Sequence, residues 1–228
     1  LTAMVLDTNI LFAGRNFNLR APEIRQMSEA FLDQMSEAFL DGQAPVNFYA
    51  QSTMQNLHLA EAQQITRAAG VKVAIIDTGI DLDHPLFAGR LTNPQYDWVD
   101  NDNVPQDEMG GKGSGHGTFV AGLVTLAAPD ALIMPLRVFS SDGRATSFNL
   151  ARAIRFATDN GADVINMSFG LLQIDELLRD ALGYAYNRSI LVAAAGNDNM
   201  GTLEYPAANI SKTISVGSTN GADMRAPF

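Results

Sequence analysis

A nearly unbroken apolar run that ends in an aspartate constrains the fold of this chain more than any other feature. Residues 71–81 read Val-Lys-Val-Ala-Ile-Ile-Asp-Thr-Gly-Ile-Asp. A run of this kind, in which polar and apolar residues do not alternate, predicts a strand buried on both faces, as in a parallel sheet. Ligands and reacting groups of open α/β sheets lie beyond the carboxyl ends of the strands. The sequence therefore places Asp77 where a catalytic residue would lie.

Strands and helices are expected to alternate along most of the chain. Apolar runs predict four further strands, at residues 132–138, 164–167, 190–194 and 213–216. Amphipathic segments predict three helices, at residues 57–69, 147–160 and 175–188. Ser147 is suited to cap the second of these helices, and Gly161 follows its end. This alternation predicts an α/β fold with a mostly parallel sheet between two layers of helices.

Composition excludes several classes of function. The chain has no cysteine, so disulfides, thiol catalysis and cysteine zinc sites are excluded. Its formal net charge is −10 and it contains no basic run, so nucleic acids and anionic membrane surfaces are poor partner candidates. No segment approaches the roughly 18 consecutive apolar residues of a membrane span. A length of 228 residues suits either one large domain or one domain with an appendage.

The appendage is expected at residues 1–50, with the main domain at residues 51–228. Residues 21–42 predict an amphipathic helix that contains the sequence Gln-Met-Ser-Glu-Ala-Phe-Leu-Asp twice in tandem. The helix is either a docking surface or the product of a duplication within an ordinary helix, and the segment as a whole suits a linker or the remnant of a propeptide. Residues 4–11 resemble the opening strand of PIN-type nucleases, in which Asp7 would bind magnesium; a plain strand and turn is the alternative.

Two further motifs carry candidate catalytic residues. His116 begins the sequence His-Gly-Thr-Phe-Val-Ala-Gly, where small residues allow a helix to start and pack closely. A histidine whose Nδ1 is held by a buried aspartate can take a proton from a serine hydroxyl, so Asp77 and His116 fit two roles of a catalytic triad. Asn197 ends Ala-Ala-Ala-Gly-Asn after an expected strand, where its amide could donate to an oxyanion. The structural alternatives are a buried histidine and an asparagine in a turn.

These three motifs, in this order and each beside an apolar strand, resemble those of the subtilases, the subtilisin-like serine peptidases. The segment Asn166–Gly170 is similar to the family's substrate-binding strand. The sequence Tyr205-Pro206-Ala207 resembles the family segment that follows the oxyanion asparagine. The resemblance covers about residues 57–228. It implies a subtilisin-like three-layer α/β fold, incomplete at the C-terminus, with a Tyr205–Pro206 bond that is cis.

The resemblance also implies a role for each site residue. Asp77 would orient His116, His116 would act as general base and acid, and Asn197 would stabilise the oxyanion. An extended polypeptide would add as a β-strand beside Ser168, Phe169 and Gly170. The pocket for the side chain before the scissile bond would be lined by Ala194, Ala195 and Gly196. The family needs no organic cofactor and is mostly secreted, so an extracytoplasmic protein is expected.

The family's nucleophilic serine, in Gly-Thr-Ser-x-Ala-x-Pro, has no match here. Ser114 precedes His116 by two residues, and Ser218 falls where the family has a structural strand. We expect the serine to lie beyond residue 228, in which case this chain alone is an inactive fragment of a serine endopeptidase. The alternative is a non-catalytic, subtilase-like module that binds peptides without cutting them.

An acidic loop before His116 is a candidate calcium site. Asp97, Asp100, Asp102 and Asp107 lie within eleven residues, and calcium takes six to eight oxygen ligands in flexible carboxylate-rich loops. Some subtilases bind calcium in a similar loop. The alternative is a solvated turn in an acidic protein.

Overall fold

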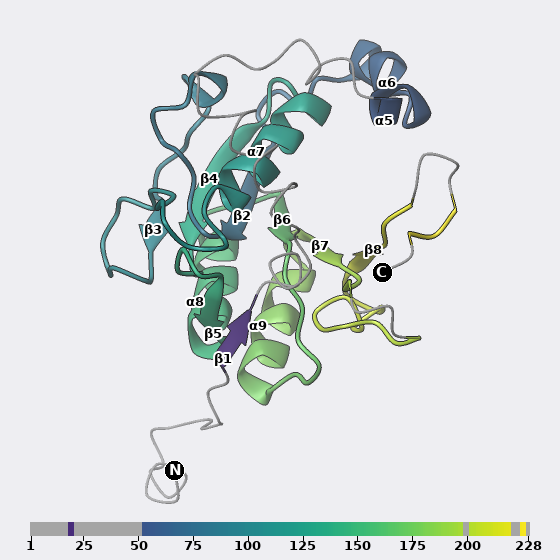
Figure 1. Cartoon of the computed structure of the whole chain (residues 1–228). Helices are drawn as coiled ribbons and strands as arrows, with labels where there is room; N and C mark the ends of the chain where they lie inside the picture. The colour runs from purple at the N-terminus through teal and green to yellow at the C-terminus, as the bar shows by residue number, and fades with distance from the viewer. Residues whose placement is uncertain (1–17, 21–51, 198–200, 220–223, 227–228) are drawn as a thin grey trace, which may run out of the picture.

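The structure, a computed structural model, describes residues 18–20, 52–197, 201–219 and 224–226 (Figure 1). The strand expected around Asp7 and the tandem-repeat helix at residues 21–42 lie outside the described residues, so both stay predictions. The proposed boundary near residue 50 also lies there.

A parallel sheet of six strands forms the centre of the fold (Figure 1). Every pair of neighbouring strands in it is parallel, as the sequence predicts. Its strands, in spatial order, are β3 (Tyr96–Asp97), β4 (Leu132–Arg137), β2 (Lys72–Asp77), β6 (Val164–Met167), β7 (Ile190–Ala194) and β8 (Ile214–Val216). The strand that carries Asp77 therefore lies inside the sheet, between β4 and β6.

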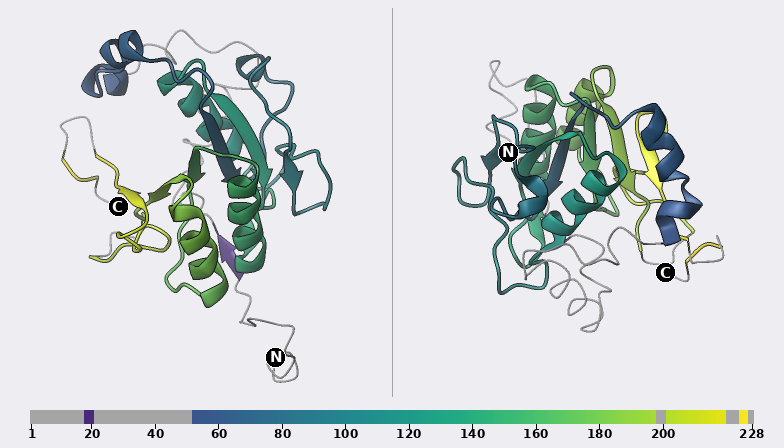
Figure 2. Two further views of the ribbon diagram at one scale, coloured as in Figure 1. Left: turned by 180° about the vertical axis from the view of Figure 1, so that it is seen from behind. Right: turned by 90° about the horizontal axis from the view of Figure 1, so that it is seen from above.

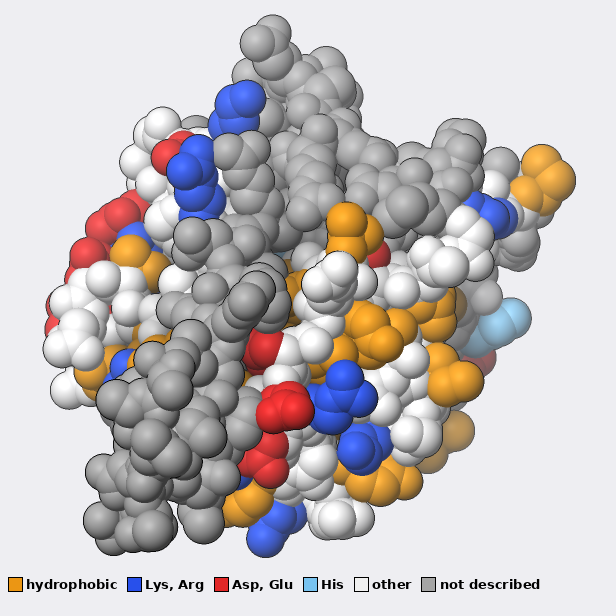
Figure 3. Space-filling model, turned by 90° about the horizontal axis from the view of Figure 1, so that it is seen from below, with side chains coloured by type: hydrophobic (Ala, Val, Ile, Leu, Met, Phe, Trp, Pro, Cys, Tyr) orange, Lys and Arg blue, Asp and Glu red, His pale blue; other side chains and the backbone are white. Residues whose placement is uncertain are grey.

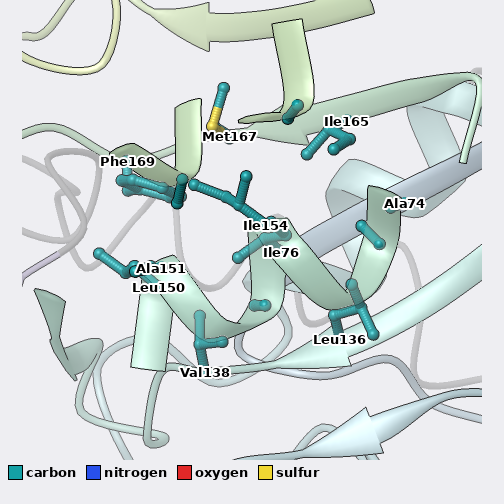
Figure 4. Packing of buried hydrophobic residues seen from close by; sticks show 14 of the residues in the cluster. Ala74, Ile76, Leu136, Val138, Leu150, Ala151, Ile154, Ile165, Met167 and Phe169 are labelled. Carbon is teal, nitrogen blue, oxygen red and sulfur yellow. The ribbon is translucent and has the colours of Figure 1, made fainter. Parts of the chain in front are cut away.

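Helices cover both faces of this sheet. Val73 and Ile75 of β2 pack in one apolar cluster with Ala121 of α7 (His116–Ala127). Ala74 and Ile76 face the other way, into a larger cluster formed with α8 (Ser147–Asp159) and α9 (Glu176–Tyr186). Figure 4 shows this second cluster, and Figure 2 shows α8 and α9 lying side by side. Burial on both faces explains why β2 reads as an apolar run without alternation.

The predicted strands after β2 are confirmed with shifts of no more than one residue, whereas the helix expected at residues 57–69 is wrong in detail. Two short helices, α5 (Ser52–Asn56) and α6 (Leu59–Ile65), replace it. His58 separates them because it adopts a left-handed conformation, with φ at 51°, which interrupts helical hydrogen bonding.

The caps of the two large helices also refine the sequence prediction. The hydroxyl of Thr146, not of Ser147, accepts the backbone hydrogen bond from Asn149 at the start of α8. Thr146 precedes the helix in an extended conformation, as an N-cap residue does. Asp175 caps α9 in the same way, through the N–H of Leu178.

Three smaller features complete the described chain. A second sheet pairs β1 (Asn18–Arg20) antiparallel to β5 (Arg144–Thr146), and a short 3-10 helix, η1 (Pro85–Phe87), follows His84. The Tyr205–Pro206 bond is cis, as expected, and so is Asn93–Pro94.

Acidic, basic and hydrophobic side chains are interspersed over the described part of the face in Figure 3. Among the described helices, none combines the length and apolar character needed to cross a bilayer.

Candidate active site

The segments predicted to bind and act on a substrate meet at one edge of the sheet. Strands β2, β6 and β7 are parallel neighbours, and their carboxyl ends point the same way. Asp77 ends β2, Ser168 follows β6, and Ala194 ends β7. The order of the strands thus gathers residues that are more than a hundred positions apart in the sequence.

Asp77 and His116 form a buried hydrogen-bonded pair. The Nδ1 of His116 lies 2.6 Å from Oδ1 of Asp77, and the two side chains are 5% and 3% exposed. The backbone N–H of Thr78 donates to the same oxygen at 2.7 Å. A carboxylate held in this way fixes the orientation of the imidazole and leaves the Nε2 nitrogen to act as a base. The pair therefore has the geometry of an oriented general base.

Glycine at position 117 allows α7 to reach the end of β2. A Cβ atom built on Gly117 would overlap the carbonyl oxygen of Gly79 and lie 3.0 Å from Cβ of Asp77. The N–H of Gly117 donates to the hydroxyl of Thr78 at 3.0 Å, which ties the first turn of the helix to the strand. The glycine after His116 is thus a condition for the contact between histidine and aspartate.

Asp107 supports the same helix from the other side. Its carboxylate accepts hydrogen bonds from the N–H of Gly115 (3.1 Å) and from the N–H (3.3 Å) and hydroxyl (2.7 Å) of Thr118. It therefore caps the N-terminus of α7, which has no cap from its own N-cap residue. Burial raises the pKa of Asp107 to about 6, against the opposing effect of these hydrogen bonds, and the nearby Asp77 charge raises it further.

The predicted peptide-binding segments lie side by side beyond β6 and β7. The ring of Phe169 packs in the core, 5.6 Å from the ring of Phe139 between centroids, so only its backbone is left for a substrate. The hydroxyl of Ser168 accepts a hydrogen bond from the amide of Asn166. Residues Ala194, Ala195, Gly196 and Asn197 are all partly buried at the end of β7.

The four acidic residues proposed as calcium ligands are not brought together. Asp97 and Asp100 each accept a 2.7 Å hydrogen bond from Nη1 of Arg137, which is 1% exposed. Asp107 lies at α7 instead, and Asp102 accepts from the N–H of Val104. Within the described ranges, no group of three or more histidines or carboxylates is arranged to hold a metal ion. Arg137 gives Asp97 and Asp100 the positive partner that the sequence analysis expected calcium to be. Calcium binding itself stays a prediction.

Sequence reasoning missed two residues of this region. Arg137 gathers Asp97, Asp100 and also Glu108, whose Oε2 lies 2.6 Å from Nη2. Burial would lower the pKa of Arg137, but the hydrogen bonds that its guanidinium group donates to these carboxylates raise the pKa overall. The sequence did contain a signal for this cluster, because an arginine at the end of an otherwise apolar strand indicates a buried charge that needs acidic partners. The second residue, Glu204, directly precedes the cis Tyr205–Pro206 bond, and no signal in the sequence singled it out.

Comparison with known proteins places this geometry in a family. The family described as "Subtilase family" matches residues 68–228 of the chain. The chain belongs to the subtilase family. This match confirms the resemblance drawn from the Asp77, His116 and Asn197 motifs, and with it the subtilisin-like α/β fold.

Several relatives share long stretches with this subtilase chain. Thermitase from Thermoactinomyces vulgaris is 37% identical over 185 residues, which are 76% of this chain and 64% of thermitase. The minor extracellular protease Vpr of Bacillus subtilis (strain 168) is 36% identical over 167 residues, 66% of this chain and 20% of that protein.

Solved structures agree with this assignment. A lanthipeptide protease superposes with a TM-score of 0.68 at 29% identity, over 82% of this chain and 60% of that one. A cold-adapted subtilisin-like serine proteinase gives a TM-score of 0.61 at 32% identity, over 70% and 59% of the two chains. The chain thus spans less than two thirds of the length of these relatives.

Proposed function

We propose that the protein to which this chain belongs is a secreted serine endopeptidase that cuts extended polypeptides through an acyl-enzyme. The observation that carries the proposal is the buried 2.6 Å hydrogen bond between His116 and Asp77 at the carboxyl edge of a parallel sheet. Relatives with long matches include one named as a thermophilic serine proteinase and one named as a minor extracellular protease. We further propose that the nucleophilic serine comes from a segment outside these 228 residues.

The first half of the proposed reaction forms the acyl-enzyme. Nε2 of His116 takes the proton of the serine hydroxyl while the serine oxygen attacks the carbonyl carbon of the scissile bond. The carbonyl oxygen becomes an oxyanion, to which the side-chain amide of Asn197 donates a hydrogen bond. Asp77 stabilises the imidazolium that has formed. The protonated Nε2 then gives its proton to the leaving amine as the C–N bond breaks.

The second half repeats these steps with water. His116 takes a proton from a water molecule, the hydroxide attacks the ester carbonyl, and the serine oxygen leaves with the proton returned by Nε2. The acid product and the free serine result. The backbone beside Ser168, Phe169 and Gly170 would hold the peptide as an added strand throughout, and Ala194, Ala195 and Gly196 would surround the side chain before the cleaved bond.

Active-site labelling of the natural protein tests this function. A fluorophosphonate probe reacts with a serine that a histidine base activates, and mass spectrometry of the labelled peptide identifies the residue. We expect labelling of one serine outside residues 1–228, with loss of labelling in His116→Ala. Glu176→Gln, a change at an exposed residue of α9, is the matched control and should label like the parent. Peptide binding without any labelling would support a non-catalytic module instead.

A further inference from the structure

The carboxylate of Asp107 joins the two elements that carry the proposed orienting aspartate and the proposed base. Asp107 is 8% exposed, and each of its carboxylate oxygens accepts two hydrogen bonds. Oδ1 accepts from the hydroxyl of Thr78 at 3.3 Å and from the N–H of Gly115 at 3.1 Å. Oδ2 accepts from the N–H and the hydroxyl of Thr118, at 3.3 Å and 2.7 Å. The carboxylate thus links the end of β2 to the first turn of α7.

Thr78 connects this carboxylate to the pair formed by Asp77 and His116. Its hydroxyl has one proton and donates it to Asp107, because an ionised carboxylate can only accept. A lone pair of the same hydroxyl therefore remains for the N–H of Gly117, which donates to it at 3.0 Å. The backbone N–H of Thr78 donates at 2.7 Å to Oδ1 of Asp77, the oxygen that also binds His116. The position of the Asp107 carboxylate is transmitted to the pair through Thr78.

The segment that presents Asp107 is itself fixed to the ends of β2 and β4. The N–H of Asp107 donates to the carbonyl of Ile80 at 3.1 Å, and the N–H of Ile80 donates to the carbonyl of Pro105 at 2.9 Å. The next residue, Glu108, lies 2.6 Å from the guanidinium group of Arg137, which ends β4. Backbone and side-chain contacts therefore determine where the carboxylate of Asp107 lies.

We propose that Asp107 is a positioning residue that, through Thr78 and the first turn of α7, holds His116 in the orientation required of the general base. This inference rests on the proposed function, in which His116 is that base. A base has to lie within hydrogen-bond reach of the proton that it takes, and a misplacement of about 1 Å can lower the rate about 10²-fold. The hydrogen bonds described for Asp107 do not involve residues 168–170 or 194–196, which are proposed to hold the peptide. Asp107 should therefore affect the chemical step and not substrate binding.

The test compares Asp107→Asn with the parent in the natural protein that contains this chain. Asparagine has one side-chain oxygen, so the donors at the other position face an NH₂ group and lose their acceptor. We expect kcat for a peptide substrate to fall about 10²-fold, while KM stays within about twofold of the parent value. The rate of fluorophosphonate labelling should fall with kcat, because it also depends on the base. Asp83→Asn changes an exposed aspartate in the loop after β2 and, as the matched control, should behave like the parent.

Two variants of Thr118 test the same contact from the side of the helix and do not require Asp107→Asn to fold. Thr118→Val keeps the shape of the side chain but removes the hydroxyl that binds Asp107, so kcat should fall and KM should not change. Thr118→Ser keeps the hydroxyl and should retain most of the parent kcat. The hydroxyl of Thr118 also accepts from the N–H of Asp81 at 2.9 Å, so the double variant Asp107→Asn/Thr118→Val isolates the contact with Asp107. Its loss of kcat should be smaller than the product of the two single losses, because both changes break one contact.

The failure of this inference differs from the failure of the proposed function. A folded Asp107→Asn variant whose kcat stays within about threefold of the parent, or whose loss appears in KM instead, overturns the positioning role and leaves the peptidase intact. If Asp107→Asn does not fold, equal kcat of Thr118→Val and Thr118→Ser overturns that role. Absence of both peptide cleavage and fluorophosphonate labelling in the parent overturns the inference and the proposed function together.

Discussion

Asp77 and His116 illustrate how much a single hydrogen bond can decide at the scale of the residue. The carboxylate receives two donors on one oxygen, the ring Nδ1 of His116 and the N–H of Thr78. It therefore holds the imidazole in the tautomer whose Nε2 is a base. A substitution that removes the charge of Asp77 but keeps the shape of its side chain separates the orienting role from a role in packing.

The substitution Asp77→Asn is expected to lower kcat of the natural protein by roughly 10⁴-fold, because an amide that donates to Nδ1 favours the wrong tautomer. Peptide hydrolysis under substrate saturation measures the change, and thermal unfolding of the same sample checks that the fold is retained. A loss of less than tenfold in a folded variant would contradict the orienting role of Asp77.

The raised pKa of Asp107 predicts a pH dependence of stability. Because burial raises this pKa from 3.8 to about 6, the folded state binds the proton more tightly than the unfolded state. The stabilisation that Asp107 contributes to the folded state is therefore fully present below about pH 4 and is lost as the pH rises through about 6. It amounts to about 3 kcal/mol of unfolding free energy. Denaturant unfolding across this range measures it.

Two variants isolate the effect of Asp107. Asp107→Asn cannot ionise, so its unfolding free energy should lack the decrease between about pH 4 and pH 6 that the parent shows. Asp83→Asn removes an exposed aspartate in the loop after β2 and should follow the parent curve. If Asp107→Asn and the parent show parallel curves, the carboxyl group of Asp107 is not the group that titrates.

At the scale of the element, the placement of α7 against β2 depends on a glycine. A methyl group at position 117 would overlap the backbone of Gly79, so Gly117→Ala should push the first turn of α7 away from the strand. We expect a loss of about 1–3 kcal/mol of stability, as for other overpacked sites, and a fall in kcat at least as large as misplacement of a base produces, about 10²-fold.

The matched control for Gly117→Ala is Gly183→Ala. Gly183 lies within α9, where the added methyl group would contact only the end of a lysine side chain, 3.8 Å away. This variant should be as stable as the parent or slightly more stable, because alanine favours the helix. Equal activity of the two variants would show that α7 accommodates the methyl group without moving His116.

The loop between β3 and α7 depends on Arg137 at the end of β4. This arginine is buried and hydrogen-bonded to Asp97, Asp100 and Glu108. Replacing it by methionine leaves the fully buried Asp97 without its partner charge, so Arg137→Met should cost about 3–5 kcal/mol. Urea unfolding measures the loss. A cost below about 1 kcal/mol would contradict this role of Arg137. Full recovery of stability on adding calcium would show that a metal ion can neutralise these carboxylates.

The sequence predicted the elements better than the contacts between them. Strands β6 and β7 and the position of Asp77 follow from apolar runs, because burial on both faces leaves a direct signature in composition. The break at His58 was missed because a single left-handed residue leaves the helical pattern almost unchanged. The grouping of Asp97 and Asp100 around Arg137 was also missed, because pairing between β3 and β4 is a long-range event that a linear cluster of acids does not reveal.

At the scale of the whole molecule, the centre of the sheet and its β8 edge differ. The central strands are covered on both faces by α7, α8 and α9. Strand β8, which pairs only with β7 in the described part of the chain, exposes Ile214 and Val216 to 56% and 50%. These side chains share one face of the strand, since they are two residues apart. A parallel sheet normally buries both faces, so this edge is the least protected part of the core.

An exposed apolar edge strand is a site for association with other chains. We therefore expect the isolated 228-residue chain to self-associate at micromolar concentrations, and we expect Ile214→Lys to reduce this association, because a lysine on an edge strand opposes pairing. Static light scattering during a concentration series measures the average mass. Met109→Lys is the matched control, since Met109 is 67% exposed but lies in a loop before α7, and it should associate like the parent. A parent chain that remains monomeric, or equal rescue by both lysines, would show that association does not begin at β8.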